Sequence, residues 1–206
     1  VELGEHLCAQ HELVGAFLRR HPDVSVRLIG RNSSAIADRV RRGELEAAVV
    51  LLPIDDDKLD VRPIVRDEVL YVSAHPERTR QPATIERLAA TPLVFYDAES
   101  ADEDPIRRQL AERAQARGLR LQPKVEVELK DIALRLVAAG IGDTYLPSAY
   151  THAPYYPEGL STASFAPALY DTFAIITRPG ARLSPGVREL LADVEYGDLG
   201  GAMAAL

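Results

Sequence analysis

The feature of this sequence that most restricts its fold is an unbroken apolar run from Ala47 to Leu52, Ala-Ala-Val-Val-Leu-Leu. A strand exposed on one face alternates apolar and polar side chains, whereas a strand buried on both faces is apolar throughout. Strands of the second kind occur chiefly in parallel sheets that carry helices on both faces. We therefore expect this run to be an inner strand of a parallel sheet in an α/β protein, and we expect Pro53 to end it.

The residues before this run predict two alternations of strand and helix. Apolar residues at helical spacing begin at Leu7 and continue until His21-Pro22 stops the pattern. A strand with alternating apolar residues follows, and the next helix is capped at residues 32–34 and ended by Gly43. With a short strand at residues 1–4, the first 52 residues have the predicted order β-α-β-α-β.

The alternation restarts after a strand at Val69–Val72 and a loop that begins at His75-Pro76 and is rich in proline, arginine and threonine. Residues 150–167 are expected to be a second long loop, because prolines and tyrosines interrupt every periodic pattern there. The elements predicted around that loop are helix 84–90, strand 93–96, a helix opened by Asp104-Pro105 and closed by Gly118, strand 125–129, helix 131–139, strand 144–146, strand 173–176 and a last helix after Ser184-Pro185.

The two halves therefore have a similar order of strands and helices, which predicts two lobes joined by paired crossings. We expect lobe I to contain residues 1–73 and 167–206, and lobe II to contain residues 74–166. The predicted fold class is α/β, with two Rossmann-like lobes and a central cleft.

Composition excludes several kinds of partner. A formal net charge of -7 repels the phosphate backbone, so these residues are not expected to bind nucleic acid themselves. No run has the apolar length of a membrane span and the N-terminus has no signal-peptide pattern, so we expect a cytoplasmic protein without a membrane partner. Cys8, the single cysteine, fits a reducing compartment and is expected to be a small buried hydrophobe.

In open α/β sheets, ligands gather outside the carboxyl ends of the parallel strands, where helix starts expose free N–H groups. Each such residue has a simpler explanation as a helix cap or a solvated side chain, but together they predict the lining of a functional cleft. The candidate ligand-binding residues are Glu5, His6, Arg31, Asn32, Ser33, Ser34, Leu52 and Pro53 in the first half, and Asp97, Glu99, Ser100, Leu129 and Thr144 in the second.

The segment from Leu13 to Val50, LVGAFLRRHPDVSVRLIGRNSSAIADRVRRGELEAAVV, resembles the corresponding stretch of LysR-type transcriptional regulators. The order and spacing of the motifs carry the resemblance, which covers essentially the whole chain. It continues through Val69–Val72 with His75-Pro76, through LRLVAAGIGDTYLP from Leu134 to Pro147, and through Arg178, Gly180 and Leu183-Ser184-Pro185 to the last helix.

The resemblance implies the C-terminal, effector-binding part of a cytoplasmic regulator, with a fold like that of type II periplasmic-binding proteins. It implies a small-molecule effector, assembly as a homodimer or homotetramer, and DNA binding only through an N-terminal winged helix-turn-helix domain that is absent from these residues. Family ligands often contact the polar helix start, here residues 31–34, the end of the first strand at Glu5 and His6, and the second-lobe loop at residues 97–100.

Two positions depart from the family pattern. Leu129 stands where many members have a small polar residue, and Asp143-Thr144 replaces a commonly apolar pair. Glu5, Asp97 and Glu99 would add negative charge to the cleft, whereas Arg31 and the helix N-termini would favour an anion. The sequence therefore leaves the charge of the effector open.

Other chemistry finds little support in the motifs. His6, Cys8, His11 and Glu12 lie around a predicted helix instead of on one face, so no metal site is expected. No dinucleotide fingerprint or hydrolase elbow is present, so we expect no cofactor and no catalytic residue.

Three functions remain for comparison. The leading one is an effector-sensing regulatory module that is not an enzyme, and the alternative is the solute-binding protein of a transporter. The third is an enzyme on the same scaffold, with Glu5 and Glu99 as acid and base. We predict that Ser33→Ala or Ser34→Ala weakens stabilisation by ligand with little change in the unliganded melting temperature, whereas an equal drop in both would indicate a helix cap.

Overall fold

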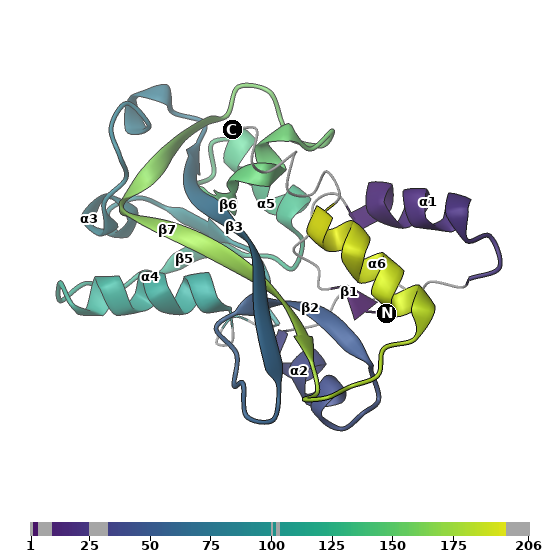
Figure 1. The fold of residues 1–206 in the computed structure, drawn as a ribbon. Helices are drawn as coiled ribbons and strands as arrows, with labels where there is room; N and C mark the ends of the chain where they lie inside the picture. The colour runs from purple at the N-terminus through teal and green to yellow at the C-terminus, as the bar shows by residue number, and fades with distance from the viewer. Residues whose placement is uncertain (1, 4–9, 25–32, 100, 102–103, 197–206) are drawn as a thin grey trace. The chain divides into compact units, whose positions relative to one another are not determined.

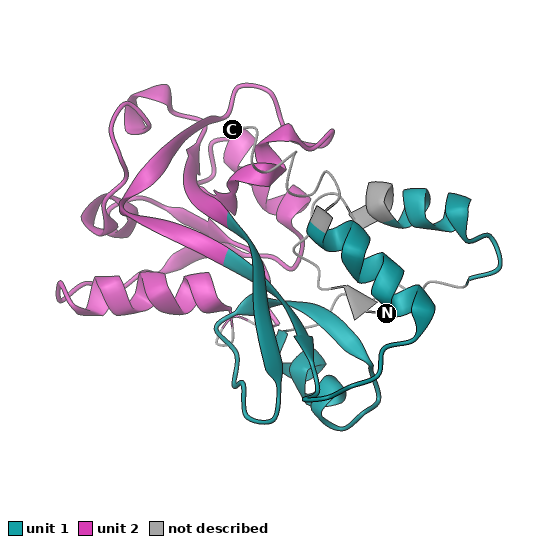
Figure 2. Cartoon of the chain, in the orientation of Figure 1, with its two compact units in different colours: residues 1–66, 172–206 teal, residues 67–171 magenta. Residues whose placement is uncertain are grey.

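In the computed structural model, which describes residues 2–3, 10–24, 33–99, 101 and 104–196, the chain forms two compact units (Figure 2). Unit 1 contains residues 1–66 and 172–206, and unit 2 contains residues 67–171. The two long strands β3 (Asp60–Ser73) and β7 (Ser161–Thr177), which are neighbours in the same sheet, pass from one unit to the other (Figure 1).

The course of these strands differs from the expected loops. The chain changes unit inside β3 and β7, whereas the sequence analysis placed the changes after residues 73 and 166. The expected loop at residues 150–167 is strand from Ser161 onward, although it contains Pro167. Proline lacks only one ladder donor, so a strand tolerates it where that donor is not needed.

The sheet of unit 1 contains the apolar run as predicted, but the sheet is mixed instead of wholly parallel. Strand β1 (Glu2–Leu3) pairs in parallel with β2 (Ala47–Leu52), and β2 pairs antiparallel with the end of β7, from Ala47 opposite Thr177 to Leu52 opposite Thr172. The antiparallel partner is the strand that returns from unit 2, which the local pattern of residues 47–52 could not reveal.

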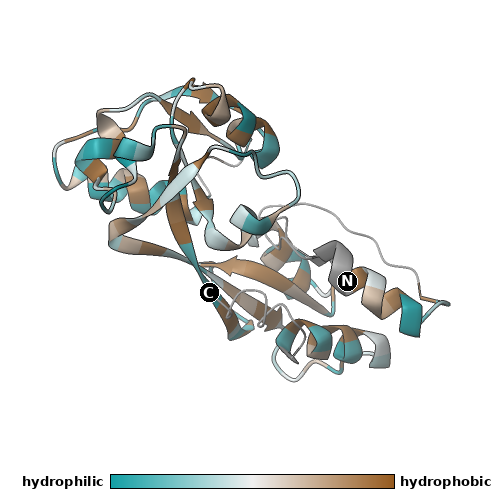
Figure 3. Ribbon diagram, turned by 90° about the horizontal axis from the view of Figure 1, so that it is seen from above, coloured by the Kyte–Doolittle hydropathy of each residue, from teal (hydrophilic) through white to brown (hydrophobic). Residues whose placement is uncertain are grey.

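Strand β2 is buried on both of its faces. Its alternate residues Ala47, Val49 and Leu51 pack in one core, to which helices α1 (Gln10–Arg20) and α6 (Pro185–Tyr196) contribute. Ala48 and Val50 pack on the opposite face with residues of α2 (Ser33–Arg41). The strands of this sheet are correspondingly hydrophobic in Figure 3.

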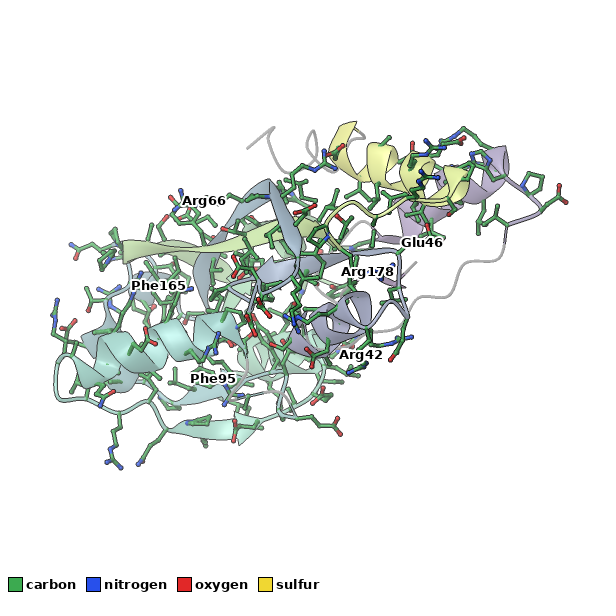
Figure 4. All side chains as sticks on the ribbon, turned by 60° about the horizontal axis from the view of Figure 1, so that its bottom comes forward. Arg42, Glu46, Arg66, Phe95, Phe165 and Arg178 are labelled. Carbon is green, nitrogen blue, oxygen red and sulfur yellow. The ribbon has the colours of Figure 1, made fainter. Side chains whose placement is uncertain are left out.

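Arg178, a residue of the family-like C-terminal motif, has a structural role in unit 1. Its guanidinium donates to the carbonyl oxygens of Val40, at 2.8 Å, and Leu45, at 3.0 Å, and so closes the end of α2 (Figure 4). Gly43 adopts a φ of 78° at this turn, as its predicted place at the helix end requires.

Unit 2 contains a separate two-stranded sheet and one edge of the five-stranded sheet that begins in unit 1. Strand β4 (Leu93–Phe95) is parallel to β5 (Pro123–Glu126), and β3 is antiparallel to β6 (Thr144–Pro147). The N–H of Val94 donates to the carbonyl of Asp143 at 2.9 Å, which links β4 to the start of β6. The remaining elements are the 3-10 turns η1 (Pro76–Arg78) and η2 (Ser148–His152) and the helices α3 (Ile85–Ala89), α4 (Pro105–Gln115) and α5 (Lys130–Ala138).

Most predicted helix ends in unit 2 are confirmed. Asp104 caps α4 by accepting the N–H of Arg107 at 2.6 Å, and Gly118 and Gly140 have φ of 70° and 74° just beyond α4 and α5. The strand predicted near residues 24–28 lies outside the described residues from Ser25 onward. None of the described helices is long and apolar enough to cross a membrane.

Candidate functional site

Four first-half candidates lie together at one edge of unit 1. The hydroxyl of Ser33 accepts the backbone N–H of Leu51 at 3.0 Å, so the start of α2 is fixed against the carboxyl end of β2. Ser34 is exposed beside it, Leu52 is half-buried and Pro53 is exposed. Glu5, His6, Arg31 and Asn32 lie outside the described residues.

Three second-half candidates meet where β4 ends. Backbone N–H groups of Asp97 and Ala98 donate to the carbonyls of Glu128 and Val127, both at 3.2 Å, and the N–H of Glu99 donates to the Glu128 carboxylate at 3.0 Å. Leu129, the capping residue of α5, follows directly and is exposed. Ser100 lies outside the described residues.

Thr144 does not belong to this edge. It is fully buried in β6, and its hydroxyl donates to the carbonyl of Tyr145 at 3.4 Å. Whether ligand contacts any of the thirteen candidates stays a prediction.

Asp97 combines backbone strain with a buried ion pair. Its φ of 54° is uncommon for a residue other than glycine, and such strain often marks a functional position. Its carboxylate is buried and accepts from the Lys130 ammonium at 3.0 and 3.2 Å. The same ammonium lies 4.6 Å from the centre of the Tyr96 ring and 5.9 Å from that of Tyr150.

Lys130 was not among the site residues predicted from the sequence, although one signal was available. Lys130 is the first residue of α5, where the positive end of the helix dipole disfavours a cation. A lysine at such a position needs a compensating anion, and Asp97 provides it.

Three further aspartates are buried in unit 2, and electrostatic coupling links Asp171 to the other two and to Asp97; we call Asp67, Asp97, Asp104 and Asp171 the acidic cluster. Asp67 accepts from the Ser148 hydroxyl and, at 3.2 Å, from the N–H of Ala149. Asp104 caps α4. Burial raises the pKa of Asp67 and that of Asp104 above the ordinary value.

Asp171 is the most perturbed member of the acidic cluster. It is 3% exposed, and its Oδ1 has no hydrogen-bond partner among the described residues. Burial, followed by repulsion from Asp104 and Asp67, raises its pKa to about 8. Asp171 is therefore largely protonated near pH 7.

Aromatic rings border the acidic cluster. Tyr145 contacts Tyr96 and Phe95, with ring centres 4.8 and 5.5 Å apart, and the Arg107 guanidinium lies 5.0 Å from the centre of the Phe95 ring. Phe95 lies alongside α4 in Figure 4. The Tyr145 hydroxyl is buried, and it too has no hydrogen-bond partner among the described residues.

Asp143, one of the two departures from the family pattern, belongs to a separate structural network. Its fully buried carboxylate accepts from the Tyr71 hydroxyl, from the Ser73 hydroxyl at 2.7 Å and from Arg78 at 2.8 Å. Burial and the neighbouring Asp143 raise the pKa of Tyr71, so the phenol stays protonated and donates. Every donor to this carboxylate is internal, which assigns Asp143 to the stability of unit 2.

Among the described residues, no group of three or more His, Cys, Asp and Glu side chains is arranged to hold a metal ion. The carboxyl groups of the acidic cluster are therefore not arranged as a metal site in the described part of the chain.

The model of the LysR substrate binding domain matches residues 4–195. This chain belongs to that family. Among curated relatives, the uncharacterized HTH-type transcriptional regulator YbhD of Escherichia coli K12 is 25% identical over 182 residues, which are 87% of this chain and 56% of YbhD. This LysR substrate-binding domain thus spans about half the length of that relative.

Solved structures confirm the predicted fold class, that of α/β domains like type II periplasmic-binding proteins. The regulatory domain of Synechocystis PCC6803 CcmR in complex with 2-PG matches with a TM-score of 0.76 and 16% identity, over 100% of this chain and 96% of that one. The BenM effector-binding domain with its effector benzoate matches with a TM-score of 0.74 and 18% identity, over 100% of this chain and 92% of that one.

Proposed function

We propose that this LysR substrate-binding domain senses a small-molecule effector in a cleft between its two lobes and controls DNA binding by an attached winged helix-turn-helix domain. The observation that carries the proposal is the group of polar side chains at the carboxyl end of β4, where Asp97 is strained, buried and ion-paired with Lys130. Such an arrangement costs stability, and it is typical of functional sites.

The position of the acidic cluster supports a coupling of binding to lobe movement. Asp67 is the first residue of unit 2 on β3, and Asp171 is its last residue on β7. A ligand that changes the bonding of these two residues acts on β3 and β7, the two strands that run from one unit into the other. Its differential affinity for two lobe arrangements then shifts their populations.

The relatives support the same proposal. CcmR and BenM are named with bound small molecules, 2-PG and benzoate, and family members are transcriptional regulators. We extend to this chain a cytoplasmic location, assembly as a homodimer or homotetramer and binding without catalysis.

A thermal-shift screen of metabolites, followed by calorimetry of each hit, tests the proposal. A one-site effector at about a hundred times its Kd stabilises the folded state by about 2.7 kcal/mol. We expect Glu99→Gln, beside Asp97, to reduce the shift, and Glu112→Gln, on the exposed part of α4, to leave it unchanged. Conversion of a hit to product would indicate an enzyme instead of a sensor. A screen in which no compound stabilises the chain would contradict both functions.

The contact between Ser33 and Leu51 changes one earlier expectation. Because the Ser33 hydroxyl already accepts the Leu51 N–H, Ser33→Ala removes a structural bond and lowers the unliganded melting temperature. Ser34→Ala, at the exposed neighbouring position, is the better test of ligand contact at the start of α2.

A further inference from the structure

We infer that unit 2 contains a second ligand site, a pocket between α3, α4 and β7 that binds a small organic carboxylate with an apolar body. The pocket has a volume of about 280 Å³, and all of its lining residues belong to unit 2. None of the candidate ligand-binding residues lines it. The inference is therefore separate from the proposed sensing function and goes beyond it.

Helix α3, one wall of the pocket, is fixed both to β7 and to α4. The N–H of Ala83, just before α3, donates to the carbonyl of Ser164 at 2.8 Å, and the N–H of Ala166 donates back to the carbonyl of Ala83 at 2.9 Å. Arg117, just beyond the end of α4, forms an ion pair with Glu86 of α3. Because these contacts are internal to unit 2, the pocket is formed in the absence of ligand.

The pocket has an apolar floor and a rim that reaches solvent. Ile85, Leu110 and Phe165, which is labelled in Figure 4, line the pocket and are buried. Ala116 and Pro167 also line it and are exposed, so a ligand can enter without opening the core. An engineered cavity of about 150 Å³ lined by such apolar side chains binds benzene. The larger volume here therefore has room for one ring or a branched chain together with a polar head group.

Arg113 gives the pocket a cation that is not paired with an acid in the described part of the chain. Its guanidinium lines the pocket and donates to the carbonyls of Pro167 and Ala168, the latter at 2.9 Å. These bonds hold the side chain in place, but they use only two of the five N–H donors of a guanidinium. Among the described residues no carboxylate contacts Arg113. Its charge and its remaining donors are therefore available to an anion.

The charges around the pocket and its apolar floor together define the ligand. The charged lining residues are two cations and one anion, Arg113, Arg117 and Glu86, which gives a formal net charge of +1. Glu86 is paired with Arg117, so an entering carboxylate would meet Arg113 as the unpaired cation. A guanidinium fits a planar carboxylate through two parallel hydrogen bonds. The floor adds a preference for a hydrocarbon body, because its apolar surface is then removed from water.

A titration followed by amide proton–nitrogen correlation NMR tests the inference, because it gives both the Kd and the place of binding. The probe is phenylacetate, and we expect saturable shifts at residues 84–86, 110–117 and 165–167. Phenylacetamide has the same skeleton without charge, phenethylamine carries the opposite charge, and acetate lacks the apolar body. Each of these three should bind at least about tenfold more weakly than phenylacetate.

Two kinds of variant separate the cation from the space. Ala116→Leu fills the rim and keeps Arg113 with its bonds, so it should weaken phenylacetate about tenfold or more. Ala111→Leu, exposed on α4 outside the pocket lining, is the matched control and should bind as the wild type does. Arg113→Met should weaken phenylacetate roughly tenfold to hundredfold, and Arg113→Lys should weaken it less because the charge remains.

Three results would each overturn the inference: no saturable shifts with phenylacetate, equal affinity for phenylacetamide or phenethylamine, or an unchanged Kd in both Ala116→Leu and Arg113→Met. Shifts confined to residues 97–99 and 128–130 would also overturn it, but they would support a ligand at the end of β4. The second site and the proposed sensing function can therefore fail separately.

Discussion

The Lys130 ammonium lies 3.0 Å from Oδ2 of Asp97, and both side chains are almost fully buried. The pair joins Lys130, the first residue of α5, to Asp97, which lies just after the end of β4. Asp97 has a φ of 54° at this position, and the pair links the segment after β4 to the start of α5.

Removal of one partner of this pair leaves a buried charge without compensation. We predict that Lys130→Met lowers the free energy of unfolding by about 3–5 kcal/mol, and that Asp97→Asn/Lys130→Met recovers much of the loss. Urea denaturation of the single and double variants measures both values. The exposed ion pair of Arg117 and Glu86 serves as control, since Arg117→Met should cost less than about 1 kcal/mol. An equal loss in the free energy of unfolding for Lys130→Met and Arg117→Met would show that burial does not make the Lys130–Asp97 pair more important for stability.

Asp171 makes stability depend on pH in a defined direction. Its pKa is raised from 3.8 to about 8 on folding, so the folded state binds more protons than the unfolded state between these values. The contribution of Asp171 to stability is therefore greatest near and below pH 4, falls by up to about 1.4 kcal/mol per pH unit as pH rises, and levels off above about pH 8. The raised pKa values of Asp67 and Asp104 act in the same direction.

Asp171→Asn tests this linkage, because asparagine has a similar shape and no titrating proton. We expect the variant to match or fall below the wild type near pH 5 and to exceed it near pH 8, in urea denaturation at a series of pH values. Asp131→Asn is the control on α5. Parallel pH profiles for Asp171→Asn and the wild type would show that Asp171 does not carry the effect.

Asp143 accepts three side-chain donors in the core of unit 2, from Tyr71, Ser73 and Arg78. We predict that Asp143→Ala lowers the free energy of unfolding by roughly 2–4 kcal/mol, because three buried donors lose their acceptor. Asp143→Asn should cost less, since its amide oxygen still accepts. Thermal denaturation measures both, and Asp60→Ala at the exposed start of β3 should change the melting temperature little.

Gly142 and Gly186 form a matched pair of glycines with opposite surroundings. A Cβ at Gly142 would lie 2.6 Å from the carbonyl oxygen of Pro92, the same oxygen that accepts the Asp143 N–H at 2.8 Å. Gly142→Ala should therefore destabilise by about 1–3 kcal/mol or more. A Cβ at Gly186, in α6, has nothing within 4 Å, so Gly186→Ala should stabilise by about 0.5–1 kcal/mol. Equal melting temperatures for the two variants would contradict a steric conflict between a Cβ at position 142 and the carbonyl oxygen of Pro92.

The local sequence pattern was sufficient to predict those strands and helix ends that are determined by residues close together in the chain. The run Ala47–Leu52 is a strand buried on both faces, Asp104-Pro105 opens α4, and Gly43 closes α2, all as the sequence predicts. The family was recognised from motif order and spacing, and the match over residues 4–195 confirms it. Apolar periodicity, side-chain caps and positive φ are decided by neighbours along the chain.

Tertiary structure alone decided the strand crossings and the chemistry of the acidic cluster. Strands β3 and β7 extend through segments that the sequence analysis left as linkers, because hydrogen bonds to a partner strand define a strand where the local pattern does not. Nothing near Asp171 or Tyr145 in the sequence marks them, since the pKa of a carboxyl group depends on which charges the fold places beside it. Asp67, Asp97, Asp104 and Asp171 come from four separate segments, and only folding gives them a common electrostatic environment.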